Sequence, residues 1–208
     1  MKFPHNISRI EAFSDAVFAF AATLLVVSVG YEESESVLKV DWAAFIGFGV
    51  SFFVLVAFWW LHYNFFRRTD YVDSWIIALN AILLFVVLYY VFPLRSLVNA
   101  LTGQEKLTIG EVGSLFQLYS LGFLLIFSCF SLMYYLAYRK TKGSNLDHDL
   151  LFYARHFTIY ILVAFISIIV ANWELGTKWA LPGLIYMLLG PLCYFHGVSF
   201  NNKFKTNL

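Results

Sequence analysis

The chain has 208 residues and a composition far from that of a soluble domain. Hydrophobic residues make up 61% of it, charged residues only 13%, and the mean hydropathy is +0.73. Soluble domains average roughly a quarter charged residues, so this composition indicates a protein whose solvent is lipid. The formal net charge of +1 gives no indication of nucleic-acid binding.

Six apolar stretches follow one another along the chain, separated by short polar segments. Each has the length of about 20 residues that a helix needs to cross the hydrocarbon core of a bilayer. The sequence therefore predicts an all-α, polytopic membrane protein in which residues 1–208 form a single transmembrane domain. The predicted helices cover residues 10–30, 42–66, 74–98, 112–138, 150–173 and 179–200.

The lysines and arginines are distributed unevenly between the two ends of these helices. One end carries ten of them, and the other end carries four, mixed with most of the acidic residues. Because cytoplasmic loops of membrane proteins are enriched in basic residues, both termini are expected in the cytoplasm. The ten basic residues are Lys2, Arg9, Arg67, Arg68, Arg139, Lys140, Lys142, Arg155, Lys203 and Lys205.

Polar side chains gather at a similar depth in the first three predicted helices. Ionisable groups are unfavourable inside a bilayer and usually face the interior of the helix bundle, where they find partners. Two interpretations remain open: a hydrogen-bond network that joins three helices, or a proton relay in which His62 passes a proton to Asp15. The network is predicted to contain Ser14, Asp15, Trp59, His62 and Asn80.

The same region carries a family resemblance. Arg9-x-x-x-Phe13-Ser14-Asp15, followed by an apolar run that ends in Thr23-Leu24-Leu25-Val26, resembles the RxxxFSD signature of the transmembrane-protein-175 potassium channel family. The resemblance covers the first half of the chain. It continues with Trp59-x-x-His62, Asp73, Leu79-Asn80 and Pro93.

The resemblance implies a bacterial homotetramer in which the first helix of each subunit lines a central pore. The pore would be narrowed by side chains of Phe20, Leu24 and Val27, with Thr23 close behind. These apolar positions share one helical face, although such a stripe is more often ordinary packing than a pore. The chain departs from the family pattern at the first constriction position, where Phe20 replaces the usual Ile or Leu.

The tetrapeptide Ser28-Val29-Gly30-Tyr31 resembles the TVGYG filter of ordinary potassium channels. That filter is a re-entrant loop whose successive carbonyls line the pore. Here the tetrapeptide ends the first predicted helix and is followed by Glu32, so we interpret it as a helix terminus with Gly30 near the C-cap.

These observations favour a potassium-preferring cation channel without a TVGYG-type filter. Its expected partners are potassium ions, three further copies of the chain and the lipid bilayer of a bacterial plasma membrane. The alternative is a proton-coupled secondary transporter that uses Asp15 and His62. No hydrolase or metalloprotease motif is present, so neither an enzyme nor a cofactor is expected. His5, His148, His156 and His196 lack metal-ligand spacing in the sequence, so no metal site is expected either.

Overall fold

The computed structural model describes residues 7–27, 42–101, 107–141 and 147–205, which are helical almost throughout and contain no strand. Six of its helical stretches are long and apolar enough to cross a membrane, so the chain is a multi-pass membrane protein, as predicted. The long helices are α1 (Ile7–Val27), α2 (Trp42–Arg68), α3 (Ser74–Leu101), α4 (Ile109–Thr141), α5 (Asp147–Asn172) and α7 (Leu189–Lys205).

The sixth span is not the continuous helix expected over residues 179–200. The chain turns through the short 3₁₀ helix η1 (Thr177–Trp179), then forms α6 (Leu181–Leu184) and the 3₁₀ helix η2 (Ile185–Leu188) before α7 begins. Proline cannot donate a backbone hydrogen bond, and Pro182 lies in the first turn of α6, where none is needed. Pro93, by contrast, lies inside α3 without ending it.

Side-chain caps define where two of the helices begin. Asp73 precedes α3, and its Oδ1 accepts a hydrogen bond from the backbone N–H of Ile76 at 2.9 Å. Before α4, Thr108 and Glu111 bond each other reciprocally: the backbone N–H of Thr108 donates to Glu111 Oε2 at 2.8 Å, and the N–H of Glu111 donates to Thr108 Oγ1 at 3.4 Å. Such caps satisfy the free N–H groups of a first turn and fix the start of a helix.

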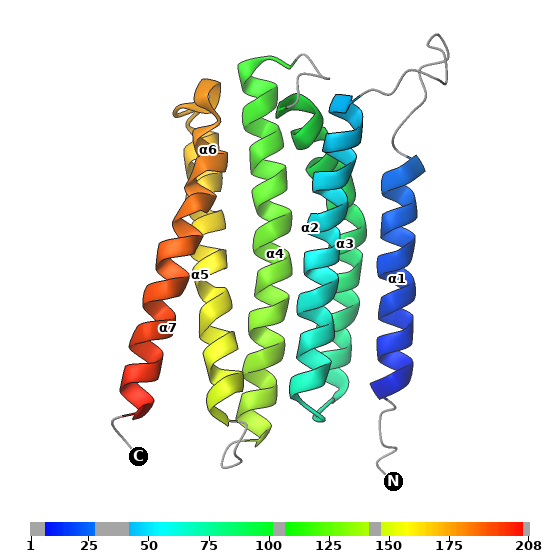
Figure 1. Ribbon diagram of the computed structural model, residues 1–208, viewed down its shortest axis with the longest axis vertical. Coiled ribbons are helices and arrows are strands. Elements are labelled where there is room, and N and C mark those ends of the chain that lie inside the picture. Colours follow the sequence, from blue (N-terminus) through cyan, green and yellow to red (C-terminus); the bar gives the residue numbers. More distant parts are fainter. Residues whose placement is uncertain (1–6, 28–41, 102–106, 142–146, 206–208) are drawn as a thin grey trace.

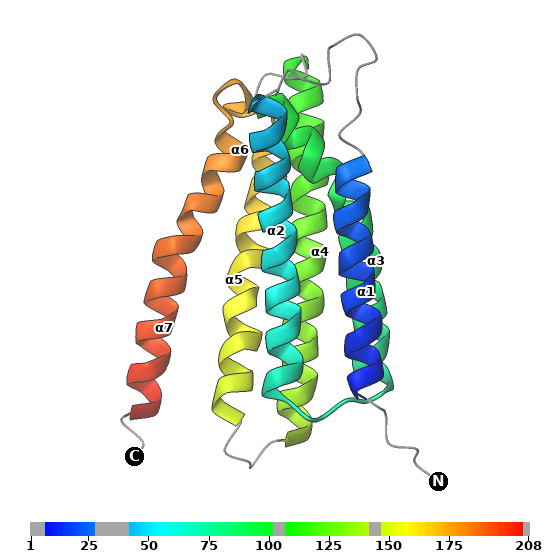
Figure 2. The same ribbon diagram turned by 45° about the vertical axis from the view of Figure 1, so that its right-hand side comes forward.

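The helices run up and down between two ends of the molecule (Figure 1). Helices α3, α4 and α5 pack in sequence, α1 packs against α2 and α3, and α7 packs against α5. Helices α1 and α7 therefore form opposite edges of the bundle, and the start of α1 lies at the same end of the molecule as the end of α7 (Figures 1 and 2). Of the six spans, the sixth (Leu181–Phe200), which includes most of α7, buries the smallest share of its residues.

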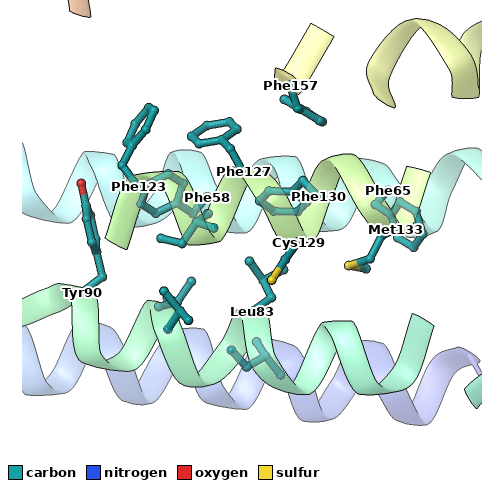
Figure 3. Packing of buried hydrophobic residues seen from close by; sticks show 14 of the residues in the cluster. Phe58, Phe65, Leu83, Tyr90, Phe123, Phe127, Cys129, Phe130, Met133 and Phe157 are labelled. Carbon is teal, nitrogen blue, oxygen red and sulfur yellow. The ribbon is translucent and has the colours of Figure 1, made fainter. Parts of the chain in front are cut away.

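The centre of the bundle is packed largely with aromatic rings. Phe127 of α4 stacks on Tyr160 of α5, with 4.4 Å between ring centroids, and Phe58 of α2 meets Phe127 edge-on at 6.0 Å. Figure 3 shows Phe58 and Phe127 in this core, together with Phe157 from α5 and Tyr90 from α3. Lipid is as apolar as these side chains, so the rings hold the helices together through close van der Waals packing.

Helices α3 and α4 approach closely at Gly122. The ring of Tyr90 lies where a Cβ atom at residue 122 would be, only 3.0 Å from its Cε2 and nearer still to its Cδ2. Tyr90 cannot move aside easily, because its ring also packs against Phe58 and Tyr119 at centroid distances of 5.5 and 5.4 Å. The close contact therefore requires glycine at residue 122.

We predict that Gly122→Ala lowers the free energy of unfolding by roughly 1–3 kcal/mol, because the added methyl group overpacks this contact. Thermal unfolding of the purified protein in detergent measures the change. Gly49→Ala on α2 is the matched control, since a Cβ there meets nothing within 4 Å. Equal stability of the two variants would show that the Tyr90 ring is free to move.

Candidate functional site

Three buried polar side chains join α1, α2 and α3. Asn80 Nδ2 donates a hydrogen bond to Ser14 Oγ at 3.0 Å, and the Ser14 hydroxyl donates to the carbonyl oxygen of Ile10 at 2.8 Å. Asn80 Oδ1 lies 2.8 Å from His62 Nε2, so His62 donates from Nε2 when the Asn80 amide is oriented this way. Ser14, His62 and Asn80 are each at most 3% exposed. We call them the buried triad.

The remaining polar pair of the predicted network lies on the surface of the bundle. The indole Nε1 of Trp59 donates a hydrogen bond to Asp15 Oδ1 at 2.8 Å, and the Asp15 side chain is exposed. Successive residues of a helix point about 100° apart, so Asp15 cannot share the inward direction of Ser14. The predicted five-residue network is therefore divided into two separate sets of hydrogen bonds. Within the described part of the chain, Asp15 and His62 share no hydrogen bond.

An apolar groove of about 230 Å³ lies beside the Asp15–Trp59 bond. It runs between α1 and α2, and Asp15 and Trp59 are the polar members of its lining. The other lining residues are Phe18, Ala19, Ala22, Phe52, Leu55 and Val56. The groove shows that these two helices do not pack tightly along this side.

Phe20, Thr23 and Val27 of the predicted constriction lie on the face of α1 that points away from its neighbours, whereas Leu24 also packs against the core. Phe20 and Val27 are 56% and 79% exposed, Thr23 is also exposed, and Leu24 is half-buried. The Thr23 hydroxyl donates to the carbonyl oxygen of Phe20 at 2.7 Å, which leaves its oxygen lone pairs available as ligands. One subunit therefore leaves Phe20, Thr23 and Val27 exposed and buries only part of Leu24.

The first residues of the sequence motif lie on the surface of α1. Arg9 is exposed, and Phe13 is 64% exposed. Phe13, Phe20 and Val27 recur at seven-residue intervals and so lie along one side of the helix. Their exposure indicates that this side contacts something other than the subunit's own helices.

The described residues contain no group of three or more His, Cys, Asp or Glu side chains that could hold a metal ion. They do contain a histidine pair that the sequence analysis missed. His156 of α5 and His196 of α7 lie with their Nδ1 atoms 3.3 Å apart. A signal was present: the two histidines are equally far in sequence from Gly176, in the turn that joins α5 to the sixth span. Residues equidistant from the turn of an antiparallel helical pair lie side by side.

We predict that Asn80→Leu destabilises the bundle by roughly 1–3 kcal/mol, because it leaves the His62 donor buried without a partner. The double variant Asn80→Leu/His62→Leu should recover part of this loss, since no unpaired donor then remains. Thermal unfolding in detergent measures both variants, with the exposed Asn172→Leu as control. Strictly additive losses in the double variant would contradict a direct bond between Asn80 and His62.

Comparisons with known proteins identify the family. The family model described as "Endosomal/lysosomal potassium channel TMEM175" matches residues 9–93, which include the buried triad and the stripe on α1. A potassium channel from Marivirga tractuosa is 33% identical over an alignment that covers 97% of this chain and 90% of that protein.

Two solved structures share the fold. A crystal structure of a variant of the potassium channel MtTMEM175 aligns with a TM-score of 0.76 and 30% identity over 93% of each chain. A TMEM175 homologue from Chamaesiphon minutus, described as a lysosomal potassium-selective channel homologue, has a TM-score of 0.65 and 21% identity, over 94% of this chain and 98% of that one. From the full-length similarity to the Marivirga protein and the matching family model, this chain belongs to the TMEM175 family.

Proposed function

We propose that the chain is a potassium-preferring cation channel, assembled as a homotetramer around a pore lined by α1. The Marivirga tractuosa protein and MtTMEM175, both similar to this chain over most of its length, are potassium channels. The observation that carries the proposal is the exposure of one apolar stripe on α1, opposite the face that holds Ser14, Phe18, Ala21 and Leu25 in the bundle. Four copies placed around an axis would turn these stripes toward one another.

In such an assembly Phe20, Leu24 and Val27 form apolar rings across the pore. A narrow apolar constriction conducts only when water fills it, so small movements suffice to open or close it. An ion that crosses must shed part of its hydration shell. Potassium holds its water less tightly than sodium does, and four Thr23 hydroxyls replace part of the lost coordination. A moderate preference for potassium follows.

The proposed channel has no filter made of stacked carbonyls. The tetrapeptide Ser28-Val29-Gly30-Tyr31 and its assignment as a helix terminus lie outside the described residues. Support for a side-chain constriction comes from the sequence, in which Glu32 stands where the TVGYG motif has its last glycine. The constriction residues on α1 are then the narrowest part of the pathway.

The buried triad positions α1 in this proposal. Its hydrogen bonds reach α1 from α3 and connect α3 to α2, so they set the rotation of α1 about its own axis. The alternative proton relay between His62 and Asp15 has no direct hydrogen bond to support it, because each residue has a different partner. We therefore assign the triad a positioning role.

We further propose a single six-helix domain in a bacterial plasma membrane, with both termini in the cytoplasm. Arg67 and Arg68 end α2, and Arg139 and Lys140 lie in the last turn of α4, at the same end of the bundle as the start of α1 and the end of α7 (Figure 1). The opposite end carries Glu111, in the first turn of α4. This distribution agrees with the enrichment of basic residues in cytoplasmic segments.

The test is a recording from the purified, tag-free protein in planar bilayers, with potassium on one side and sodium on the other. A reversal potential shifted toward the potassium equilibrium potential supports the channel, and chemical cross-linking of the same sample should give a tetramer. A folded tetramer that carries no current at any voltage, but shows saturable flux driven by a pH gradient, would instead favour the proton-coupled transporter.

We predict that Thr23→Val lowers the potassium-to-sodium permeability ratio by a factor of roughly 2 to 10, equivalent to about 0.4–1.4 kcal/mol. The substitution keeps the shape of the side chain and removes the hydroxyl ligands. Thr158→Val is the matched control: Thr158 lies on α5 and also donates to a backbone carbonyl of its own helix, at 3.1 Å. An unchanged ratio in Thr23→Val would exclude Thr23 from the selectivity of the pore.

We predict that Phe20→Ala raises single-channel conductance several-fold, because four smaller side chains widen the apolar ring and let it fill with water more often. Phe165→Ala on α5 provides the control, since Phe165 has a similar exposure of 53% but lies on a different helix. Single-channel recording measures both. Conductance that responds equally to the two substitutions would place the constriction elsewhere.

A further inference from the structure

The His156–His196 pair brings two nitrogen ligands together on neighbouring helices. Their Nδ1 atoms are 3.3 Å apart, and His156 and His196 are both half-buried. At this separation a metal-free pair must share one proton, with one ring donating and the other accepting. The pair lies apart from the buried triad and from the stripe on α1, so it is independent of the proposed channel function.

Aromatic neighbours hold both imidazoles in place. Phe152 stands against the two rings, with centroid distances of 5.2 Å to His156 and 5.1 Å to His196. Tyr160 packs on His156 at 5.7 Å and Phe200 on His196 at 6.0 Å. Rings confined in this way lose little further freedom when they bind a ligand, so the pair is largely preorganised.

The separation of the two nitrogens fits one metal ion. Imidazole nitrogens bind zinc at about 2.0–2.1 Å, and two such ligands at the tetrahedral angle are then about 3.3 Å apart. The observed distance between the Nδ1 atoms matches this value. Binding would require the shared proton to leave, because each nitrogen must offer a lone pair to the metal.

We propose that His156 and His196 bind one divalent transition-metal ion through their Nδ1 atoms, with water completing its coordination. Imidazole ligands suit copper, nickel and zinc, whereas magnesium and calcium prefer oxygen. The described residues supply no third His, Cys, Asp or Glu ligand. Arg155 acts electrostatically on His196 from nearby, and its positive charge opposes a cation. The site is therefore one of modest affinity.

A bound ion would clamp α7 to α5. Helix α7 forms most of the sixth span, Leu181–Phe200, which has the smallest buried share of the six, and α5 is the long helix against which α7 packs. Because little of this span is buried, a metal bridge between His156 and His196 would strengthen its attachment to α5. Metal binding should therefore raise the resistance of the folded protein to heat, because the ligand favours the folded state only.

The experiment uses the full chain without an affinity tag, treated with chelator and then titrated with Cu²⁺, Ni²⁺, Zn²⁺ or Mg²⁺. Isothermal titration should give one ion per chain and affinities in the order Cu²⁺ above Ni²⁺ and Zn²⁺, with no Mg²⁺ binding. The electron paramagnetic resonance spectrum of the copper form should show coupling to two nitrogens. Melting temperature should rise with each metal that binds.

Four substitutions decide the ligand set, two at the proposed ligands and two as controls. His156→Gln and His196→Gln should each weaken binding by at least about tenfold, a change of about 1.4 kcal/mol, while melting in the absence of metal shows that each variant is folded. His148→Gln, also on α5, and Cys193→Ser, one turn before His196, should bind as the original chain does. Absence of binding in the original chain, or loss of binding in either control, would overturn the proposal.

Discussion

The hydrogen bonds among Ser14, Asn80 and His62 are the interaction on which the arrangement of the first three helices depends. Apolar surfaces in a bilayer gain little from one another, because lipid offers them an equivalent environment. Lipid offers no hydrogen-bond partners to a buried side-chain amide, so burial of the amide costs free energy unless both its donor and its acceptor find partners in the protein. Asn80 meets this requirement with one partner on α1 and another on α2. Rotation of either helix would break a bond.

Packing around this triad is uneven across the bundle. The central helices share a dense aromatic core, in which Phe127 contacts rings from both α2 and α5. The edge helices α1 and α7 lack this density, and each is tied to the bundle by specific polar contacts: the triad for α1 and the histidine pair for α7. Aromatic packing thus joins the central helices, whereas polar contacts join the edge helices to them.

The sequence predicted the number and type of the helices, because hydropathy over about 20 residues reports membrane insertion directly. Helix ends were less predictable. Helix α4 extends three residues beyond its expected range at each end, and Thr108 and Glu111 form the cap at its N-terminal end. The turn at the start of the sixth span was also missed, since its positive φ angles at Gly176 and Ala180 depend on tertiary contacts.

The residues of the candidate site were predicted together, but their hydrogen bonds were not, because those bonds depend on tertiary structure. Depth along a helix can be counted from the sequence, so residues at one level were recognised together. The direction in which each side chain leaves its helix decides its hydrogen-bond partner. Asp15 therefore bonds Trp59, whereas Ser14 bonds Asn80. The proximity of His156 and His196 required the position of the turn between their helices, which composition alone does not supply.

The sequence separation within the triad has a consequence for how the protein is made. Ser14 and Asn80 are 66 residues apart, so α1 is synthesised well before α3 emerges to pair with it. Until then the Ser14 hydroxyl relies on the carbonyl of Ile10 in its own helix, which it can bond without any other part of the chain. This local bond lets α1 enter the membrane alone, and the bond from Asn80 is added later without breaking it. The order of synthesis and the order of hydrogen bonding are thereby compatible.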